Sequence, residues 1–316
     1  MSSCNLLLMI VYSLLLLTVS LAFVSVFLLW RSSSLSLPGK LLNILLSVSL
    51  GVFIYLYGAW VFISVYTKYI FAGCFVIVFV LSLIRKKTDY SSKAGAWRTV
   101  ANLFFIIVLA ILSVLYFTGT TGKPDGIADL EFPFKKGNYF VFQGGKGLPT
   151  NIFHYGFRGA VFAMDIVKLN VAGNRAKHIF STNLNDYEIF GDTIYSPCSG
   201  IVLASKSDNP DNTPPNRDRG PSNTNQVLIE TPSFYVFLGH MKHGAVFVQE
   251  GQFVAAGQPL GLVGNSGFSL EPHLHIQVHA KTGKGLPWYK EKQLLIAFNG
   301  KSYLLFEEIR ANLDDK

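Results

Sequence analysis

The chain has 316 residues, half of them hydrophobic, and its formal net charge is +8. This length leaves room for two domains. The charge is uneven, because residues 1–118 hold eight Lys or Arg against one acid, whereas the remainder holds 19 basic and 18 acidic residues. The positive excess therefore accompanies the apolar half. This pattern indicates loops that flank a membrane and argues against a basic surface for nucleic acid.

The three cysteines give no sign of a disulfide framework or a thiolate metal site. Cys4 and Cys74 lie in the apolar half, and only Cys198 lies in the polar half. A single cysteine cannot form an internal disulfide there, and no paired spacing is present. We interpret Cys198 as a small, half-buried apolar residue.

The first 118 residues contain four apolar runs, which we predict to be membrane-spanning helices of about 20 residues. The first run is too long for the apolar part of a signal peptide and lacks a basic segment before it, which argues against that alternative. The second and third runs share one apolar stretch, divided by the polar residues Thr67, Lys68 and Tyr69. The predicted spans are 6–30, 42–66, 70–84 and 100–117. The third is short for a span, so an earlier start with Lys68 reaching to the interface is the alternative.

The basic residues between these runs predict an orientation. Arg31 and Lys40 mark the first loop as cytoplasmic, and the five basic residues between Arg85 and Arg98 mark the third. Both ends of the chain then lie outside, and the part after Phe117 is extracytoplasmic. No Asp, Glu, Lys, Arg or His lies within the spans as drawn, which favours a membrane anchor over a transport path.

The composition changes after residue 118. Residues 119–129 are rich in Gly, Thr and Pro and are predicted to be a linker. Residues 130–316 contain many short β-like runs separated by turn residues, so we expect an all-β domain of short antiparallel strands. The polar stretch 205–225 is predicted to be a surface loop, with a lid over a nearby groove as the alternative.

The most informative stretch is Gly261 to His279. Its alternation of apolar and polar residues predicts a strand with His273 and His275 on one face. Two neighbouring imidazoles suit a zinc site in which one ring binds the metal and the other handles protons.

Several motifs carry a family resemblance in the same order along the chain. They are Ser196-Pro-Cys-Ser-Gly, Leu238-Gly-His240, Gly264-Asn-Ser-Gly and Pro272-His-Leu-His. Over about residues 141–280 the chain resembles the lysostaphin/LytM-type zinc metallopeptidases. The Gly-rich segment near Glu250 also resembles a lipoyl or biotin carrier, but no lysine stands where such a hairpin would present it. The resemblance implies a LytM-like β-barrel or sandwich.

The resemblance also implies a site. It gives zinc three ligands, His154, Asp165 and His275, and leaves a fourth position for water. It makes His240 and His273 the catalytic histidines. The common family pattern separates the first two ligands by four residues, whereas His154 precedes Asp165 by eleven, as in a branch with an intervening loop. The remaining candidates are expected to be bystanders: His178, His243 and His279.

The resemblance implies a zinc endopeptidase that hydrolyses peptide bonds of bacterial peptidoglycan, with a zinc-bound water as nucleophile, and the predicted spans imply that it is anchored in a membrane. The expected location is the bacterial inner (cytoplasmic) membrane, multi-pass, with the catalytic domain extracytoplasmic or periplasmic. The expected partners are peptidoglycan peptides, the lipid bilayer and cell-wall or division proteins. The alternative is a catalytically inactive LytM-like module that binds or regulates cell-wall hydrolases.

Overall fold

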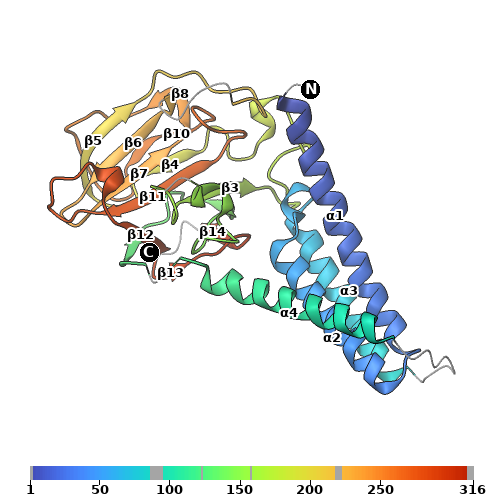
Figure 1. Ribbon diagram of the computed structural model, residues 1–316. Helices are drawn as coiled ribbons and strands as arrows, with labels where there is room; N and C mark the ends of the chain where they lie inside the picture. Colours follow the sequence, from blue (N-terminus) through green and yellow to red (C-terminus); the bar gives the residue numbers. More distant parts are fainter. Residues whose placement is uncertain (1–2, 86–94, 122–123, 157–158, 218–222, 312–316) are drawn as a thin grey trace. The chain divides into compact units, whose positions relative to one another are not determined.

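The computed structural model describes residues 3–85, 95–121, 124–156, 159–217 and 223–311 (Figure 1). It divides into two compact units, one formed by Leu6–Tyr116 and one that comprises the chain from Phe117 onward. The first is helical, and the second consists mainly of antiparallel strands. The predicted fold class, four apolar helices followed by an all-β domain, is confirmed.

Four helices of the first unit are long and apolar enough to cross a membrane. Each has at least 20 residues, the length that the apolar layer of a bilayer requires. Asn43 in the second helix donates from Nδ2 to the carbonyl oxygen of Leu28 in the first, at 2.6 Å. The helices are α1 (Ser3–Ser32), α2 (Leu37–Tyr57), α3 (Val65–Ile84) and α4 (Ala96–Thr118).

The predicted division of the second and third spans at residues 67–69 is wrong, and the alternative, an earlier start of the third span, is confirmed. The break lies at residues 58–64 instead of 67–69, and it contains the short helix η1 (Trp60–Phe62). Gly58 ends α2 in an extended conformation, and the Ser64 hydroxyl caps α3 by accepting from the backbone N–H of Tyr66. Lys68 consequently lies inside α3, where its ammonium group sits 4.4 Å from the centre of the Tyr55 ring.

The second unit contains one large sheet and one small sheet. Eight strands of the large sheet follow the order β14-β2-β3-β11-β7-β6-β5-β9, and the small sheet has the order β4-β10-β8. The bounds are β1 (Ile127–Leu130), β2 (Gly137–Gln143), β3 (Met164–Leu169), β4 (Thr193–Tyr195), β5 (Gly200–Lys206), β6 (Gln226–Glu230), β7 (Phe234–Gly239), β8 (Met241–Val246), β9 (Phe253–Val254), β10 (Pro259–Val263), β11 (Leu274–Ala280), β12 (Gln293–Phe298), β13 (Lys301–Ser302) and β14 (Glu308–Ala311). The short helices are α5 (Ile152–Tyr155), η2 (Leu184–Asp186) and η4 (Trp288–Lys290).

Alternate apolar side chains of both sheets form one hydrophobic core. Leu274, Ile276 and Val278 of β11 are fully buried in it, together with Leu260 of β10. Because successive side chains of a strand point to opposite faces, the polar residues of β11 all lie on the other face. Strand β11 lies between β3 and β7 (Figure 1). This arrangement brings polar groups from three strands together.

Strand β1 begins inside the segment that we expected to be a linker. Ile127 pairs with Leu295 of β12, and the pairing of the two strands is parallel. The apolar residues Ala128 and Leu130 are buried in the core. The β structure of the second unit therefore starts a few residues earlier than the composition indicates.

Candidate active site

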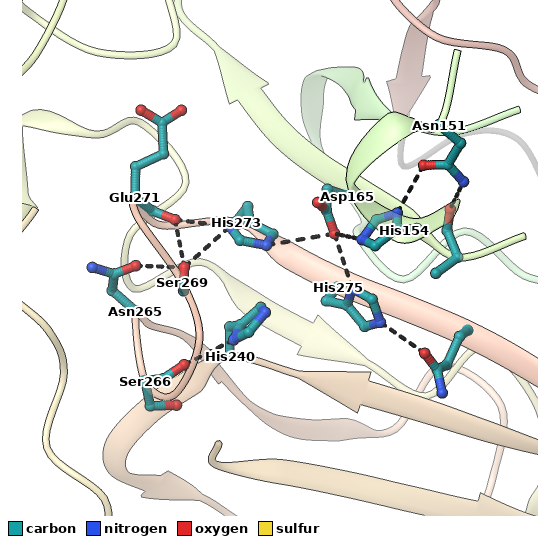
Figure 2. Close-up of polar contacts among 12 residues, drawn as sticks. Asn151, His154, Asp165, His240, Asn265, Ser266, Ser269, Glu271, His273 and His275 are labelled. Atoms are coloured by element: carbon teal, nitrogen blue, oxygen red, sulfur yellow. Dashed lines mark hydrogen bonds and ion pairs between the residues drawn. The ribbon is translucent and has the colours of Figure 1, made fainter. Parts of the chain in front are cut away.

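Three predicted ligands converge on one point (Figure 2). His275 of β11 is directly opposite Asp165 of β3 in the antiparallel register, so their side chains are neighbours on one face. Asp165 Oδ1 lies 3.0 Å from His275 Nδ1 and 3.3 Å from His154 Nε2. Ligand atoms of the three residues all lie within 4.8 Å of one another. The structure therefore brings together His154, Asp165 and His275, although they come from α5, β3 and β11.

The spacing of eleven residues between His154 and Asp165 has a structural cause. Asn151 donates from Nδ2 to the carbonyl oxygens of Val161 and Ala163, at 3.0 and 2.9 Å, and so ties the residue before α5 to the residues just before β3. Its Oδ1 accepts from His154 Nδ1 at 2.8 Å. Asn151 was missed in the sequence. The sequence offered one indication of its role: it is an asparagine three residues before His154, in the segment that has to bring this histidine close to β3.

The second histidine of the cluster is held in the same manner. Gln277 Oε1 accepts from His275 Nε2 at 3.0 Å. An amide oxygen only accepts hydrogen bonds, so the proton of each imidazole lies on the nitrogen that faces Asn151 or Gln277. In their neutral forms, His154 and His275 then direct the lone pairs of Nε2 and Nδ1 towards the Asp165 carboxylate, as a shared cation would require. When protonated, the same nitrogens donate to that carboxylate.

This donor set fits a zinc ion. Zinc takes nitrogen and carboxylate ligands at about 2.0–2.2 Å in a tetrahedron, which separates neighbouring ligand atoms by about 3.3 Å. The two distances to Asp165 Oδ1, 3.0 and 3.3 Å, match that separation. Metal-bound histidines also donate their other ring N–H to an acceptor, as His154 and His275 do here.

The other two predicted residues form a histidine pair beside this cluster. His240 lies between β7 and β8 with φ of 63°, a left-handed conformation that is uncommon outside glycine. Its ring centre is 4.6 Å from that of His273 and 5.7 Å from that of His275. His273 Nε2 lies 3.5 Å from Asp165 Oδ1. All five predicted site residues thus lie in one place (Figure 2).

Main-chain carbonyls orient the histidine pair. His240 Nδ1 donates to Ser266 O and His273 Nδ1 donates to Glu271 O, both at 2.8 Å. Because a carbonyl oxygen only accepts, both rings carry a proton on Nδ1, and the neutral form of each ring keeps the lone pair of Nε2. That nitrogen is then available to accept a proton from a ligand in the cavity described below.

The Glu271 side chain is held by a buried ion pair that the sequence did not reveal. Arg175 donates from Nε and Nη2 to the two carboxylate oxygens, at 2.8 and 2.7 Å. The side chains are only 2% and 7% exposed. Arg175 is 96 residues away in the sequence, so no local pattern could have identified it as the partner.

The polar stretch 205–225 is not an independent surface loop in its described part. Asn212, Thr224 and Asn225 are buried, and Asp211 forms a β-bridge with Ser266. The prediction of a surface loop is therefore wrong for these residues, because their polar groups bond to the turn before β11.

A cavity of about 650 Å³ covers the site. One wall is aromatic, with Phe237 stacked on Trp288 at 5.3 Å between ring centres. At another part of the lining, the Arg217 guanidinium lies 4.5 Å from the centre of the Phe268 ring. The five predicted site residues line the same cavity. The cavity combines apolar walls with a few converging polar groups, as ligand-binding pockets do.

Burial and mutual charge set the ionisation of the site. Burial would raise the pKa of Asp165, but His154 and His273 hold it well below its usual range. Burial, together with His273 and His275, lowers the pKa of His240 well below its usual value. Burial also opposes charge on His273, yet Asp165 raises its pKa. The site thus combines an anionic carboxylate with a neutral His240.

The three histidines expected to be bystanders lie outside the metal-ligand group. His279 is fully buried, and its Nδ1 and Nε2 each lie 3.0 Å from a carbonyl oxygen, that of Glu291 and that of Gly159 respectively. Its pKa is lowered by burial. His243 is exposed, and its backbone N–H donates to Asp211. His178 is exposed as well.

Comparisons with known proteins give a family match. Residues 185–287 match the model of Peptidase family M23. This range includes His240, His273 and His275, whereas His154 and Asp165 precede it. A search among curated proteins found no match.

Solved structures similar to this chain include M23 peptidases. The catalytic domain of a mutant of the prophage-encoded M23 protein EnpA from Enterococcus faecalis is 19% identical, with 49% of this chain and 88% of that chain covered and a TM-score of 0.30. The catalytic domain of lysostaphin from Staphylococcus simulans is 19% identical, with 47% and 82% covered and a TM-score of 0.26. A SpoIIIAH–SpoIIQ complex is matched at 12% identity, with 48% and 95% covered and a TM-score of 0.32.

Proposed function

Because the chain carries a domain of Peptidase family M23, of the lysostaphin/LytM type, we propose that it is a zinc-dependent endopeptidase of bacterial peptidoglycan. The observation that carries the proposal is the convergence of His154 Nε2, Asp165 Oδ1 and His275 Nδ1 in a cavity that His240 and His273 also line. A structural role alone does not require five such side chains at the floor of one cavity.

We assign His154, Asp165 and His275 to the metal. Two neutral imidazoles and one carboxylate suit a divalent cation and leave a position open for water. Bound zinc would polarise the scissile carbonyl and make a coordinated water more acidic. Asn151 and Gln277 keep the two imidazoles in the tautomers that binding requires.

We assign proton transfer to His240 and His273. Each presents an Nε2 lone pair, because Nδ1 donates to a carbonyl oxygen. One of them accepts the proton of the attacking water and later delivers a proton to the leaving amine. A protonated ring at this position also stabilises negative charge on the scissile carbonyl oxygen.

The helical unit supports a membrane location. Its four apolar helices act as an anchor, and the excess of basic residues between them favours the bacterial inner membrane with the peptidase domain on the extracytoplasmic face. Peptidoglycan lies on that face. Other cell-wall or division proteins are candidate partners.

The proposal is tested on the full chain purified in detergent. We expect about one zinc per chain and the release of new amino groups from purified peptidoglycan. His275→Ala should abolish both, while the exposed His178→Ala should change neither. A protein that binds peptidoglycan without zinc and without cleavage would instead be a LytM-like binding module.

A further inference from the structure

We propose that Asn212 is a positioning residue for both His240 and His273, acting through the turn 265–269. The inference deepens the proposed function and rests on it for its consequence in catalysis. It assigns to the polar stretch 205–225 a role in orienting the histidine pair.

Asn212 bonds to the turn with its backbone and its side chain. Its backbone N–H donates to Asn265 O at 3.0 Å, and its own carbonyl accepts from Asn265 Nδ2 at 2.9 Å. Its Nδ2 donates to Gly267 O at 2.6 Å and to Ser269 O at 3.2 Å. The residue is only 6% exposed. These four contacts hold the turn at its beginning, middle and end.

The neighbouring loop residues strengthen this attachment. Asp211 Oδ1 accepts from the backbone N–H of Asn265 at 2.7 Å. At Gly267, φ is +75° and an added Cβ would lie 2.0 Å from Thr224 Oγ1. The loop and the turn are thus packed so closely that only glycine fits between them.

The same turn contacts both histidines (Figure 2). His240 Nδ1 donates to Ser266 O at 2.8 Å. The Ser269 hydroxyl lies 3.3 Å from His273 Nδ1, 2.6 Å from Asn265 Oδ1 and 2.9 Å from Glu271 O. Glu271 O is the acceptor for His273. A shift of the turn therefore tilts both imidazoles.

The amide of Asn212 matters because it donates. Asn212→Asp has nearly the same shape, but it would place a carboxylate against the carbonyl oxygens of Gly267 and Ser269. The turn would have to move away from the loop. A displacement of about 1 Å at a catalytic group can cost a hundredfold in rate.

We expect Asn212→Asp to lower kcat by about 10- to 100-fold with KM changed by less than about threefold. The zinc content should stay unchanged, because the bonds that orient the metal-binding histidines come from Asn151 and Gln277, which are not part of the turn. Asn216→Asp is the matched control, since it makes the same substitution at an exposed position of the same loop. Its kcat should be that of the unaltered protein.

If Asn212→Asp does not fold, Asn212→Ala provides the test instead. It removes the donor without adding charge, and a loss of kcat of at least about fivefold is expected with zinc retained. A kcat within twofold of the unaltered protein would overturn the inference. So would a loss of zinc in parallel with activity, which would indicate general disruption.

A second readout separates this inference from the proposed function. The Nδ1–H signals of His240 and His273 can be followed by 15N NMR in the full chain and assigned with His→Gln variants. In Asn212→Asp these signals should shift, whereas those of His154 should not. If the unaltered protein cleaves nothing but the signals respond, the proposed function fails and the positioning role stands. Unchanged signals would overturn the positioning role.

Discussion

The metal cluster and the histidine pair adjoin each other in one cavity, yet they are held in different ways. The imidazoles of His154 and His275 bond to the side-chain oxygens of Asn151 and Gln277. The imidazoles of His240 and His273 bond instead to main-chain carbonyls, which belong to the turn and the segment before β11.

This difference determines which substitutions affect each part. A side-chain acceptor can be removed by one mutation, so the geometry of the metal cluster depends on residues next to it. A carbonyl cannot be removed, so the histidine pair changes only when its segment moves. The residues that hold the segment, Asn212 and Arg175, come from distant parts of the chain. Metal content and turnover should therefore respond to different sets of variants.

The largest effect on turnover is expected from removing a histidine of the pair. His240→Ala should lower kcat by about 10²- to 10⁴-fold, the usual contribution of a general acid or base. Zinc per chain should remain that of the unaltered protein, because His240 is not in the ligand group. His243→Ala, an exposed histidine three residues further, is the control. Zinc lost together with turnover would show that the two parts are not separable.

The second-largest effect is expected on the free energy of unfolding, through the ion pair between Arg175 and Glu271, whose carbonyl oxygen accepts from His273. Arg175→Met leaves the Glu271 carboxylate buried without its partner and should cost about 3–5 kcal/mol of unfolding free energy. The double variant Arg175→Met/Glu271→Leu should recover most of that loss, because no buried charge remains. Urea denaturation followed by tryptophan fluorescence measures both variants.

An exposed pair gives the control for this measurement. Lys177 and Asp186 form an ion pair on the surface, with the lysine 62% exposed. Lys177→Met should change the unfolding free energy far less than Arg175→Met does, because solvent screens the pair. If Lys177→Met and Arg175→Met lowered the unfolding free energy equally, burial would not be what makes the Arg175 ion pair important.

The five residues that meet in the cavity were all named from the sequence, but on different grounds. Short motifs contain four of them, whereas His154 was chosen by its place before Asp165, at a spacing that departs from the common family pattern. His273 and His275 lie two apart on one strand, and strand alternation alone puts them on one face. What orients them could not be predicted. Asn212 and Arg175 act over tens of residues, through contacts that appear only when the loops have folded. The position of the break between α2 and α3 was also missed. It depends on Gly58, which ends α2, and on Ser64, which caps the start of α3, whereas in the sequence Lys68 is the more conspicuous polar residue.

A smaller effect is expected on metal affinity. Gln277→Leu has a similar size but cannot accept from His275 Nε2, so zinc affinity should fall by about 10- to 100-fold. Competition with a zinc chelator measures it. Gln226→Leu is the control, because Gln226 lines the same cavity and comes from β6. At saturating zinc, kcat of Gln277→Leu should recover. A kcat that stays low would mean that Gln277 also positions the histidine pair.

The smallest effect on function is expected at Cys198, outside both parts of the site. Burial raises the pKa of its thiol to about 12, against about 8.5 in an unfolded chain. Folding thus favours the neutral thiol, and this stabilising contribution is present below about pH 8.5 and is lost as the pH rises towards 12.

With Cys4 and Cys74 replaced by serine, alkylation at pH 9 reports on Cys198 alone. The thiolate fraction there should be about 10³-fold smaller in the folded protein than in urea, so alkylation should be correspondingly slow. Cys198→Ala should leave zinc content and kcat unchanged. The Asn212 and Gln277 variants should keep the slow rate, because they disturb the site and not the core. Fast alkylation in either variant would show that its loss of activity comes from general unfolding, and the separation between metal cluster and histidine pair would then lose its support.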